Sequence, residues 1–455
     1  MFVPRSSEMY QNSEETLKSL SQTKEESPVI TLDASAPASF AKVEPAAPVA
    51  VFKLTSDFKA DENPKKVNLG VGAFRTEESK PWVLPVVRKA EKIIVDDLDL
   101  TKEYLPIAGL ESYREAVKIF ALGKESKVLK EGRAVGIQSV SGTSALRLAA
   151  DFLKKYYGNG DGTTPVYVSK PTWPNHLGIF KAAGHTNIIP YEYWDADNLC
   201  LDFDKMIEAF KNAPKHSIFI FHCCAHNPTG CDPTKDQWIE IAKVVAENQG
   251  FPIFDTAYQG FATGDPEADA WPLRLFAEAN FEMFVVSSFS KNFGLYNERI
   301  GQLTAITRNS DHNSAIKSQL EILVRTNYSN PPVHGALIVS TILNNPELKK
   351  EWLENLNYMS SRIRQMRSLL YNQLNKISTP GKWDHILTQI GMFSYTGLSA
   401  EQCDWLKENK SLYLMRSGRI NMCAVTSSNV EYIAESIKES FGISNDSSSG
   451  DDSGI

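Results

Sequence analysis

A lysine suited to covalent chemistry follows an apolar run in the second half of the chain. Lys291 comes directly after Ser288-Phe289-Ser290, and Arg299 follows it within one or two helical turns. Most of the 48 basic residues must be solvated, so a lysine placed among hydroxyls beside a buried strand is unusual. Desolvation and a cationic neighbour both lower a lysine's pKa, as imine formation with a carbonyl compound requires. This segment therefore indicates an imine-forming lysine.

Two other strand ends carry polar groups that could serve such a lysine. Asp255 ends the apolar run FPIFD and Tyr258 follows three residues later, although a helix N-cap explains Asp255 about as well. Ser141-Gly142-Thr143 opens a helical stretch, where free backbone amides suit a phosphate. Taken alone, that triplet is better explained as an ordinary N-cap. Each signal is weak by itself, and only their combination indicates a functional site.

A histidine and cysteine cluster at 222–226 (HCCAH) invites a metal-site interpretation. The first three of these residues continue a strand, so neighbouring side chains point to opposite faces and cannot all reach one ion. No second cluster completes a four-ligand set, and the sequence therefore predicts no metal. The turn at 227–230 (Asn-Pro-Thr-Gly) is more informative, although Asn-Pro also starts ordinary turns.

These groups need a sheet that brings the ends of several strands together. Seven β-branched runs read as strands: 135–140, 165–169, 186–190, 217–222, 251–255, 283–288 and 301–307. Helical stretches, including 143–157 and 236–248, separate most of them. Strands that are apolar on both faces and alternate with helices indicate a mostly parallel sheet covered on both sides. Ligands of such sheets bind beyond the carboxyl ends of the strands, where the polar groups lie.

The pattern changes after about residue 335. A long helical stretch at 345–376 precedes a strand-like segment at 389–396 and a final helix near 429–441, which predicts a second, smaller α+β unit. The first 45 residues and the acidic, Ser-rich residues 444–455 hold no lasting helical or strand period. We expect both ends to be disordered.

Composition excludes several classes of protein. The chain has 455 residues, 42% of them hydrophobic, and its net charge of −7 disfavours general binding to nucleic acid or anionic lipid. No apolar run approaches the roughly 18 residues of a membrane-spanning helix. Six cysteines are too few for a disulfide framework, and the first 50 residues fit neither a secretory signal nor a mitochondrial presequence. We therefore expect a soluble protein of the reducing cytoplasm.

In this order along the chain, the motifs resemble those of the aspartate aminotransferases, pyridoxal-phosphate enzymes of fold type I. The resemblance rests on Ser141-Gly142-Thr143, Trp173 with His176, Asn227-Pro228-Thr229-Gly230, Asp255-x-x-Tyr258, Ser288-x-Ser290-Lys291 and Arg299. It runs from about residue 52 to 441 and includes the segments 68–75, 103–110, 324–332 and 417–426. Segments 81–87 and 418–423 look most like the animal cytosolic form.

The resemblance implies an α/β fold in which a large domain holds a mostly parallel seven-stranded sheet covered by helices, beside a smaller α+β domain. The implied division has five parts: an extension (1–45), an N-terminal arm with part of the small domain (46–82), the large cofactor-binding domain (83–357), the rest of the small domain (358–443) and the tail (444–455).

The resemblance also implies a cofactor, pyridoxal 5′-phosphate. Lys291 would hold it as an imine and carry a proton during catalysis. Asp255 would keep the pyridine nitrogen protonated, with support from His176 and His222. The other implied cofactor contacts are Trp173 stacked on the ring, Asn227 and Tyr258 at the phenolic oxygen, and Ser141, Gly142, Thr143, Ser288, Ser290, Arg299 and a second subunit's Tyr104, mostly at the phosphate. Pro174 departs from the family, which usually has Gly or an acidic residue there, and it restrains Trp173 towards extended geometry.

For the substrate, the resemblance implies two arginines. Arg419 would pair with the α-carboxylate, with help from Gly72, Trp173 and Asn227, and Arg325 of a second subunit would bind the distal carboxylate. The implied protein is a homodimer with shared active sites. It would move an amino group reversibly between L-aspartate and 2-oxoglutarate, giving oxaloacetate and L-glutamate. The alternatives are a related aminotransferase with aromatic or sulfinate substrates, and a catalytically silent relative that acts as a binding protein.

Overall fold

The computed structural model describes residues 39–445. The chain divides into two compact units, residues 1–48 and 49–455. Of the first unit only residues 39–48 are described, and all of them are exposed. The expected disorder at the two ends therefore falls largely outside the described residues.

A seven-stranded sheet forms the centre of the second unit, with strand order β2-β10-β9-β8-β7-β3-β4. Its strands are β2 (Ala134–Ser139), β3 (Val166–Lys170), β4 (Ile188–Glu192), β7 (Ile218–His222), β8 (Phe251–Thr256), β9 (Met283–Ser288) and β10 (Gly301–Ile306). β10 is antiparallel to both of its neighbours, β2 and β9, whereas the other neighbours pair in parallel. The predicted mostly parallel sheet of seven strands is confirmed.

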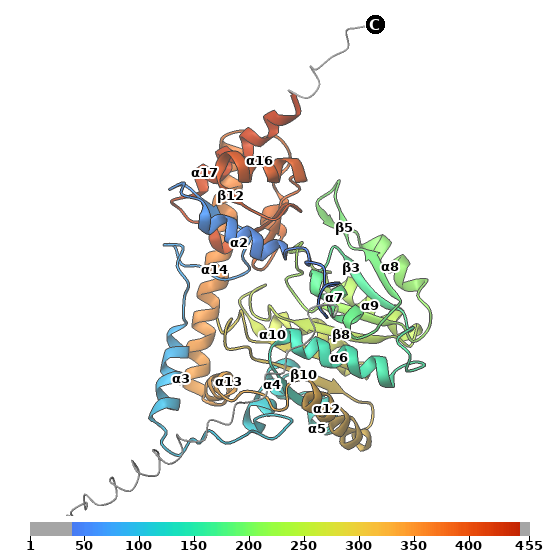
Figure 1. Cartoon of the computed structure of the whole chain (residues 1–455). Helices are drawn as coiled ribbons and strands as arrows, with labels where there is room; N and C mark the ends of the chain where they lie inside the picture. The colour runs from blue at the N-terminus through green and yellow to red at the C-terminus, as the bar shows by residue number, and fades with distance from the viewer. Residues whose placement is uncertain (1–38, 446–455) are drawn as a thin grey trace, which may run out of the picture. The chain divides into compact units, whose positions relative to one another are not determined.

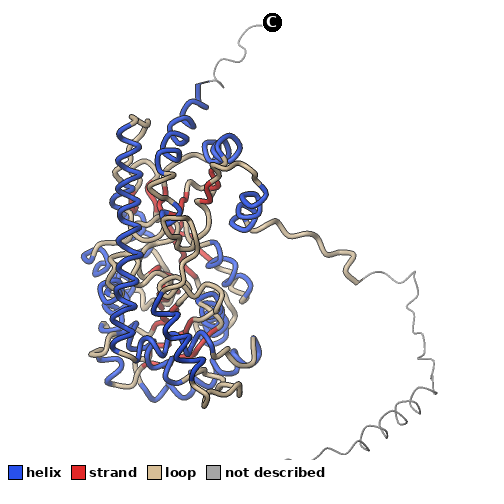
Figure 2. The backbone as a smooth tube through the Cα atoms, turned by 90° about the vertical axis from the view of Figure 1, so that its left-hand side faces the viewer, coloured by secondary structure: helices blue, strands red, loops and turns tan. Residues whose placement is uncertain are grey.

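Helices cover both faces of this sheet, so its central strands are buried on both sides. In β7, Ile218 and Ile220 join one buried cluster, and Phe219 and Phe221 join the other. This alternation follows from the two-residue period of a strand. The first cluster includes residues of α6 (Gly142–Tyr156), α7 (Pro174–Ala182) and α12 (Asn313–Asn327); the second includes residues of α4 (Glu111–Leu122), α8 (Phe203–Lys211), α9 (Lys235–Glu247) and α11 (Trp271–Glu278). Figure 2 shows the strands, in red, between the helices.

A smaller α+β part joins residues from both ends of the second unit. β1 (Val67–Asn68) pairs in parallel with β12 (Leu412–Tyr413), and β11 (Phe393–Tyr395) pairs antiparallel with β13 (Arg419–Asn421). The helices of this part are α2 (Ala50–Ala60), α16 (Ala400–Lys410) and α17 (Val430–Ser440). The long helix α14 (Pro346–Lys376) packs against α17 and also against α3 (Pro85–Asp96) and α13 (His334–Asn344) (Figure 1).

The strand expected at 389–396 is shorter in the structure, because only Phe393–Tyr395 is extended and paired. The side-chain oxygen of Gln389 accepts hydrogen bonds from Ser394 and from the backbone N–H of Tyr395, which folds residues 389–392 into a loop. Gly391 supports this turn with a φ of 77°.

The remaining elements are short. They are β5 (Trp194–Asp195), β6 (Cys200–Leu201), α5 (Lys127–Lys130), α10 (Pro266–Asp269), α15 (His385–Thr388) and the 3-10 turns Ser310–His312, Met422–Ala424 and Phe441–Asn445. No helix within residues 39–445 has the length and apolar character that crossing a membrane requires.

Candidate active site

A cavity of about 210 Å³ lies at the carboxyl ends of the central strands. Its lining is Ser141, Gly142, Thr143, Trp173, His222, Asn227, Asp255, Ala257, Tyr258, Ser288, Ser290, Lys291, Tyr296 and Arg299. These residues lie at or after the ends of β2, β3, β7, β8 and β9, because parallel strands place their carboxyl ends at one edge of the sheet. Most of the predicted cofactor residues therefore share one cavity.

Lys291 lies within this cavity, with its Nζ 4.8 Å from the ring centre of Tyr258. Burial lowers the pKa of Lys291 below its ordinary value. The carboxylate of Asp255 opposes this shift, and the guanidinium groups of Arg299 and Arg419 add to it. An amine with a lowered pKa is available as a nucleophile and as a proton acceptor at neutral pH.

Asp255, at the end of β8, lines the cavity and is buried together with His176 and His222. Its Oδ2 lies 3.2 Å from Nε2 of His176, whose Nδ1 is 2.8 Å from Oγ1 of Thr172. Burial alone would raise the pKa of Asp255, but the His176 hydrogen bond and nearby positive charge hold that pKa below its usual value. Burial, with a smaller contribution from His226, keeps the pKa of His222 well below its usual value, so that ring is neutral at pH 7.

The same trio is the group of side chains within residues 39–445 whose arrangement could hold a metal ion. Ligand atoms of His176, His222 and Asp255 all lie within 4.8 Å of one another. His176 and Asp255 are already hydrogen-bonded to each other, which leaves an ionised carboxylate at the cavity wall. The prediction that the protein uses no metal stays a prediction.

An anion site lies at another part of the cavity, where α6 begins at Gly142. The side chain of Ser141 caps this helix by accepting a hydrogen bond from the backbone N–H of Ser144 at 3.3 Å. A Cβ on Gly142 would lie 2.8 Å from the Cβ of Ser288, so only glycine permits this close approach. Arg299 adds a positive charge to the helix N-terminus, and the two together favour a phosphate.

Arg419 lies beside the cavity and is held from several sides. Its Nη1 donates to Oδ1 of Asn227 at 3.2 Å, and its Nη2 donates to the Gly70 carbonyl at 2.8 Å. The guanidinium lies 4.2 Å from the ring centre of Phe393, and a Cβ on Gly72 would approach that ring to 2.9 Å. Arg419 and Gly72 do not line the cavity themselves, but Arg419 contacts Asn227, which does.

Tyr104 and Arg325 are not among the residues that line the cavity of this chain. The side chain of Tyr104 is 81% exposed. Arg325, near the end of α12, is exposed and donates to Ser329 and to Asn330. Both are the residues expected to act in a second subunit.

Sequence reasoning missed two lining residues, Ala257 and Tyr296. Ala257 lies between the predicted Asp255 and Tyr258, so position alone could have found it. The hydroxyl of Tyr296 accepts a hydrogen bond from the backbone N–H of Phe74 at 2.8 Å, a long-range contact without a local sequence signal.

Pro174 takes the first position of α7, where a missing N–H costs nothing, and Trp173 precedes it with extended geometry (φ −63°, ψ 120°). The Trp173 ring meets the His176 ring edge to face at 5.4 Å. The proline is thus compatible with a tryptophan at the cavity wall.

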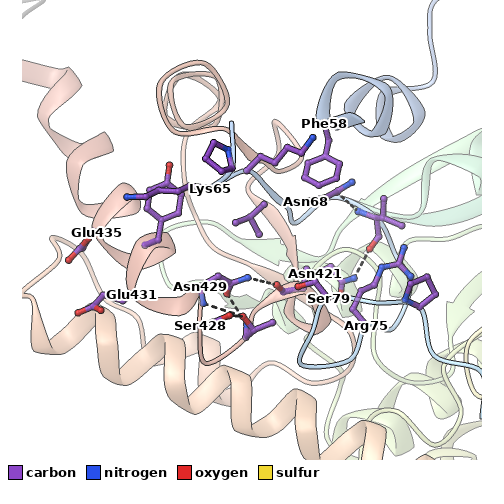
Figure 3. A pocket seen from close by; sticks show the side chains of 18 residues that line it. Phe58, Lys65, Asn68, Arg75, Ser79, Asn421, Ser428, Asn429, Glu431 and Glu435 are labelled. Atoms are coloured by element: carbon purple, nitrogen blue, oxygen red, sulfur yellow. Dashed lines mark hydrogen bonds between the residues drawn. The ribbon is translucent and has the colours of Figure 1, made fainter. Parts of the chain in front are cut away.

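A larger cavity of about 940 Å³ lies elsewhere, between the segment 58–81 and the segment 421–435 (Figure 3). Polar side chains dominate its lining, among them Asn68, Arg75, Asn421 and Glu431. It contains none of the predicted cofactor or substrate residues. Size therefore does not identify the site; the convergence of chemical groups does.

The chain is similar to known proteins over most of its length. The family model described as aminotransferase class I and II matches residues 64–437. The chain is 51% identical over 401 residues to the cytoplasmic aspartate aminotransferase of Gallus gallus, which covers 88% of this chain and 97% of that protein. The structure of aspartate aminotransferase from the cytoplasm of Saccharomyces cerevisiae has 42% identity and a TM-score of 0.86, covering 89% of this chain and 98% of that one.

An aromatic-amino-acid aminotransferase from Burkholderia pseudomallei, solved covalently bound to pyridoxal phosphate, has 40% identity and a TM-score of 0.85. The match covers 89% of this chain and 100% of that one. The family match spans most of the chain, and the identities extend over nearly the full length of these relatives. The chain therefore belongs to the class I and II aminotransferase family.

Proposed function

We propose that the protein is a pyridoxal-phosphate-dependent aspartate aminotransferase. It transfers an amino group between L-aspartate and 2-oxoglutarate, giving oxaloacetate and L-glutamate in a ping-pong cycle. The observation that carries the proposal is the single cavity in which Lys291, Asp255 and the anion site at α6 meet. The cytoplasmic aspartate aminotransferases among its relatives support the choice of substrate and a cytoplasmic location.

The residues present fit pyridoxal phosphate. The helix N-terminus at Gly142 with Arg299 matches the phosphate, the ionised Asp255 matches a protonated pyridine nitrogen, and Lys291 matches the aldehyde. Trp173 supplies a flat apolar wall, and Nε2 of His222 is buried without a hydrogen-bond partner among residues 39–445. When bound, the cofactor supplies an electron sink for the bond that breaks at the substrate Cα.

The chain's own groups then have separate tasks. Lys291 accepts the proton from the substrate Cα and returns it, as its lowered pKa permits. Asp255, held by His176, keeps a proton on the pyridine nitrogen by its negative charge. Arg419 pairs with the α-carboxylate through its planar guanidinium, which Asn227 orients.

A homodimer completes this site. Tyr104 and Arg325 are exposed in one chain, and we assign them to the phosphate and the distal carboxylate of the partner's site. The segment around Tyr104 also exposes Val95 and Leu98, at 73% and 94%, which a subunit interface would bury. We also propose that residues 46–82 form an N-terminal arm with part of the small domain, 83–357 the large domain and 358–443 the rest of the small domain; the pairing of β1 with β12 supports the first of these assignments.

The test is the substrate profile of Arg325→Leu beside the wild type. A distal carboxylate without its guanidinium leaves an unpaired charge in the site, so kcat/KM for aspartate and glutamate falls by about a hundred-fold or more. Phenylalanine leaves no charge unpaired, and its kcat/KM falls much less. Equal losses for aspartate and phenylalanine would contradict the assignment of Arg325.

The second candidate is an aminotransferase with broader substrates, which the similarity to the aromatic-amino-acid enzyme of Burkholderia pseudomallei favours. Steady-state rates of the wild type with aspartate, cysteine sulfinate and phenylalanine distinguish the two. A kcat/KM for phenylalanine equal to that for aspartate would select the second candidate.

A further inference from the structure

A carboxylate outside the cavity holds the loop that follows β7. Oδ2 of Asp232 accepts a hydrogen bond from the backbone N–H of Ala225 at 2.6 Å, and Oδ1 accepts one from His226 at 2.9 Å. Ala225 has a φ of 51°, a conformation that a regular strand or helix cannot satisfy. Asn227, the residue after His226, lines the cavity.

A second carboxylate holds the neighbouring loop, which follows β8. Oδ2 of Asp269 accepts hydrogen bonds from the backbone N–H groups of Gly260 at 2.7 Å and Ala262 at 3.0 Å. Its Oδ1 accepts two more from Thr263, at 3.1 Å from the backbone N and 2.7 Å from Oγ1. The same loop begins with Tyr258, whose carbonyl accepts from the N–H of Phe261 at 2.8 Å.

Ordinary structural roles do not account for these two carboxylates. Asp265 caps α10 and Thr234 caps α9, so neither Asp232 nor Asp269 is a helix N-cap. Neither forms an ion pair with any residue in 39–445. Burial raises the pKa of Asp232 to about 6 and also raises that of Asp269, so each negative charge costs free energy where it lies.

We propose that Asp232 and Asp269 are positioning residues of the cofactor site, each fixing one of two adjacent loops so that Asn227 and Tyr258 reach the same atom, the phenolic oxygen of the bound cofactor. The strands β7 and β8 that precede these loops are parallel neighbours, with His222 opposite Asp255. The loops are irregular, so the register of the strands does not determine their conformation. The two carboxylates hold the loops instead, through hydrogen bonds from backbone N–H groups. This inference rests on the proposed function.

The test compares Asp232→Asn and Asp269→Asn with Asp202→Asn as a matched control. Asp202 also accepts a backbone N–H, that of Lys205, but it caps α8 and does not hold a cavity loop. The asparagine side chain keeps one acceptor oxygen, but its NH₂ group faces a backbone N–H that the carboxylate had accepted. That hydrogen bond is lost, and the loop is held less tightly. The full-length proteins are loaded with pyridoxal phosphate, and their visible absorbance is titrated against pH.

Hydrogen bonds donated by Asn227 and Tyr258 favour the anionic form of the phenolic oxygen. Weaker hydrogen bonds from these residues therefore raise the pH midpoint of the absorbance change. We expect an upward shift of about 0.5 unit or more in both loop variants, and none in the control. We also expect the affinity for pyridoxal phosphate to fall by about three-fold or more, measured by fluorescence titration. A merely structural role lowers the melting temperature without moving the midpoint, and that result would overturn the proposal.

Hydrogen exchange on the wild type covers the case in which a variant does not fold. The amides of Ala225, His226, Gly260 and Ala262 should exchange as slowly as those of β7 and β8. Fast exchange at these amides overturns the proposal. A wild type that does not bind pyridoxal phosphate overturns both this inference and the proposed function. A wild type that binds it while the loop variants keep its midpoint overturns the inference alone.

Discussion

The charges around Lys291 act on it in opposite directions. Burial lowers its pKa, with Arg299 and Arg419 adding to the effect, while Asp255 raises it. The net shift is downward, so the free amine is more populated at neutral pH than for a surface lysine. A single residue can therefore bind a carbonyl group and later move a proton.

Replacing Lys291 with alanine separates these tasks from cofactor binding. We expect Lys291→Ala to retain some pyridoxal phosphate through the anion site at α6, but to lose the pH-dependent visible band. Turnover with aspartate should fall by about ten-thousand-fold, because no other amine lies in the cavity lining. Absorbance spectra and steady-state assays check both results. Near-normal transamination by this variant would show that the central assignment is wrong.

His385 makes stability depend on pH at a place away from the cavity. Burial lowers its pKa to about 4 in the folded state, against 6.5 for a free histidine. Between pH 6.5 and pH 4, His385 is therefore protonated in the unfolded chain but mostly neutral in the folded chain. The free energy of unfolding consequently falls as the pH falls from 6.5 towards 4. Between pH 7 and pH 4.5, His385 alone should cost about 2–3 kcal/mol.

In His385→Gln this loss should disappear, so the variant's free energy of unfolding should decline less on acidification than that of the wild type. Urea unfolding at both pH values measures the difference. His312→Gln, at an exposed turn, is the control and should follow the wild type. If the free energy of unfolding fell equally in His385→Gln and in the wild type, burial of His385 would not be the cause of the pH dependence.

At the scale of elements, α14 connects the smaller α+β part to the sheet that carries Lys291. Trp352 of α14 is fully buried and stacks on Phe293 at 4.6 Å. Its Nε1 donates to the carbonyl of Asn292, the residue next to Lys291, at 2.9 Å. The helix thus packs against the loop that contains Lys291.

We expect Trp352→Ala to destabilise the protein by about 3–5 kcal/mol, since it leaves a large cavity between packed aromatic rings. Trp352→Phe keeps most of the volume and loses the hydrogen bond to Asn292, so it should cost about 1–2 kcal/mol. Ile239→Ala on the exposed side of α9 should change stability by about 0.5 kcal/mol or less. Denaturant midpoints rank the three variants, and equal losses for the two Trp352 variants would show that packing contributes little.

At the scale of the whole molecule, the proposed function implies an active site built from two chains. Arg419 belongs to the chain that holds the cavity, and Arg325 is exposed, where it would serve the partner's cavity. An isologous dimer has two such sites, each with one arginine from each chain. Activity is then a property of the pair.

Mixing Arg325→Leu with Arg419→Leu should therefore restore activity that neither variant has alone. Half of the dimers in a random mixture are mixed, and each of these has one site with both arginines, so about a quarter of wild-type activity should return. Native mass spectrometry confirms that the subunits have exchanged. Exchange without recovery would place both arginines in the same chain's site.

The sequence by itself determined the sheet and the chemistry at its edge. The seven strands, α6, α9 and α14 lie where the hydrophobic pattern predicted them, because each element must bury its apolar side chains. Lys291, Asp255 and Gly142 follow such strands, and parallel pairing brings strand ends together whatever the loops do. Local pattern and strand geometry were enough for these residues.

The tertiary structure decided the hydrogen bonds that individual polar side chains form. The hydroxyl of Tyr296 reaches the N–H of Phe74, and Asp269 reaches back to the loop at Gly260, with no periodicity to announce either contact. The strand expected at 389–396 is shorter in the structure, because the Gln389 side chain accepts a hydrogen bond from the backbone N–H of Tyr395. Such contacts depend on which groups lie nearby after folding, and hydrophobic pattern carries information only about which face of an element is buried.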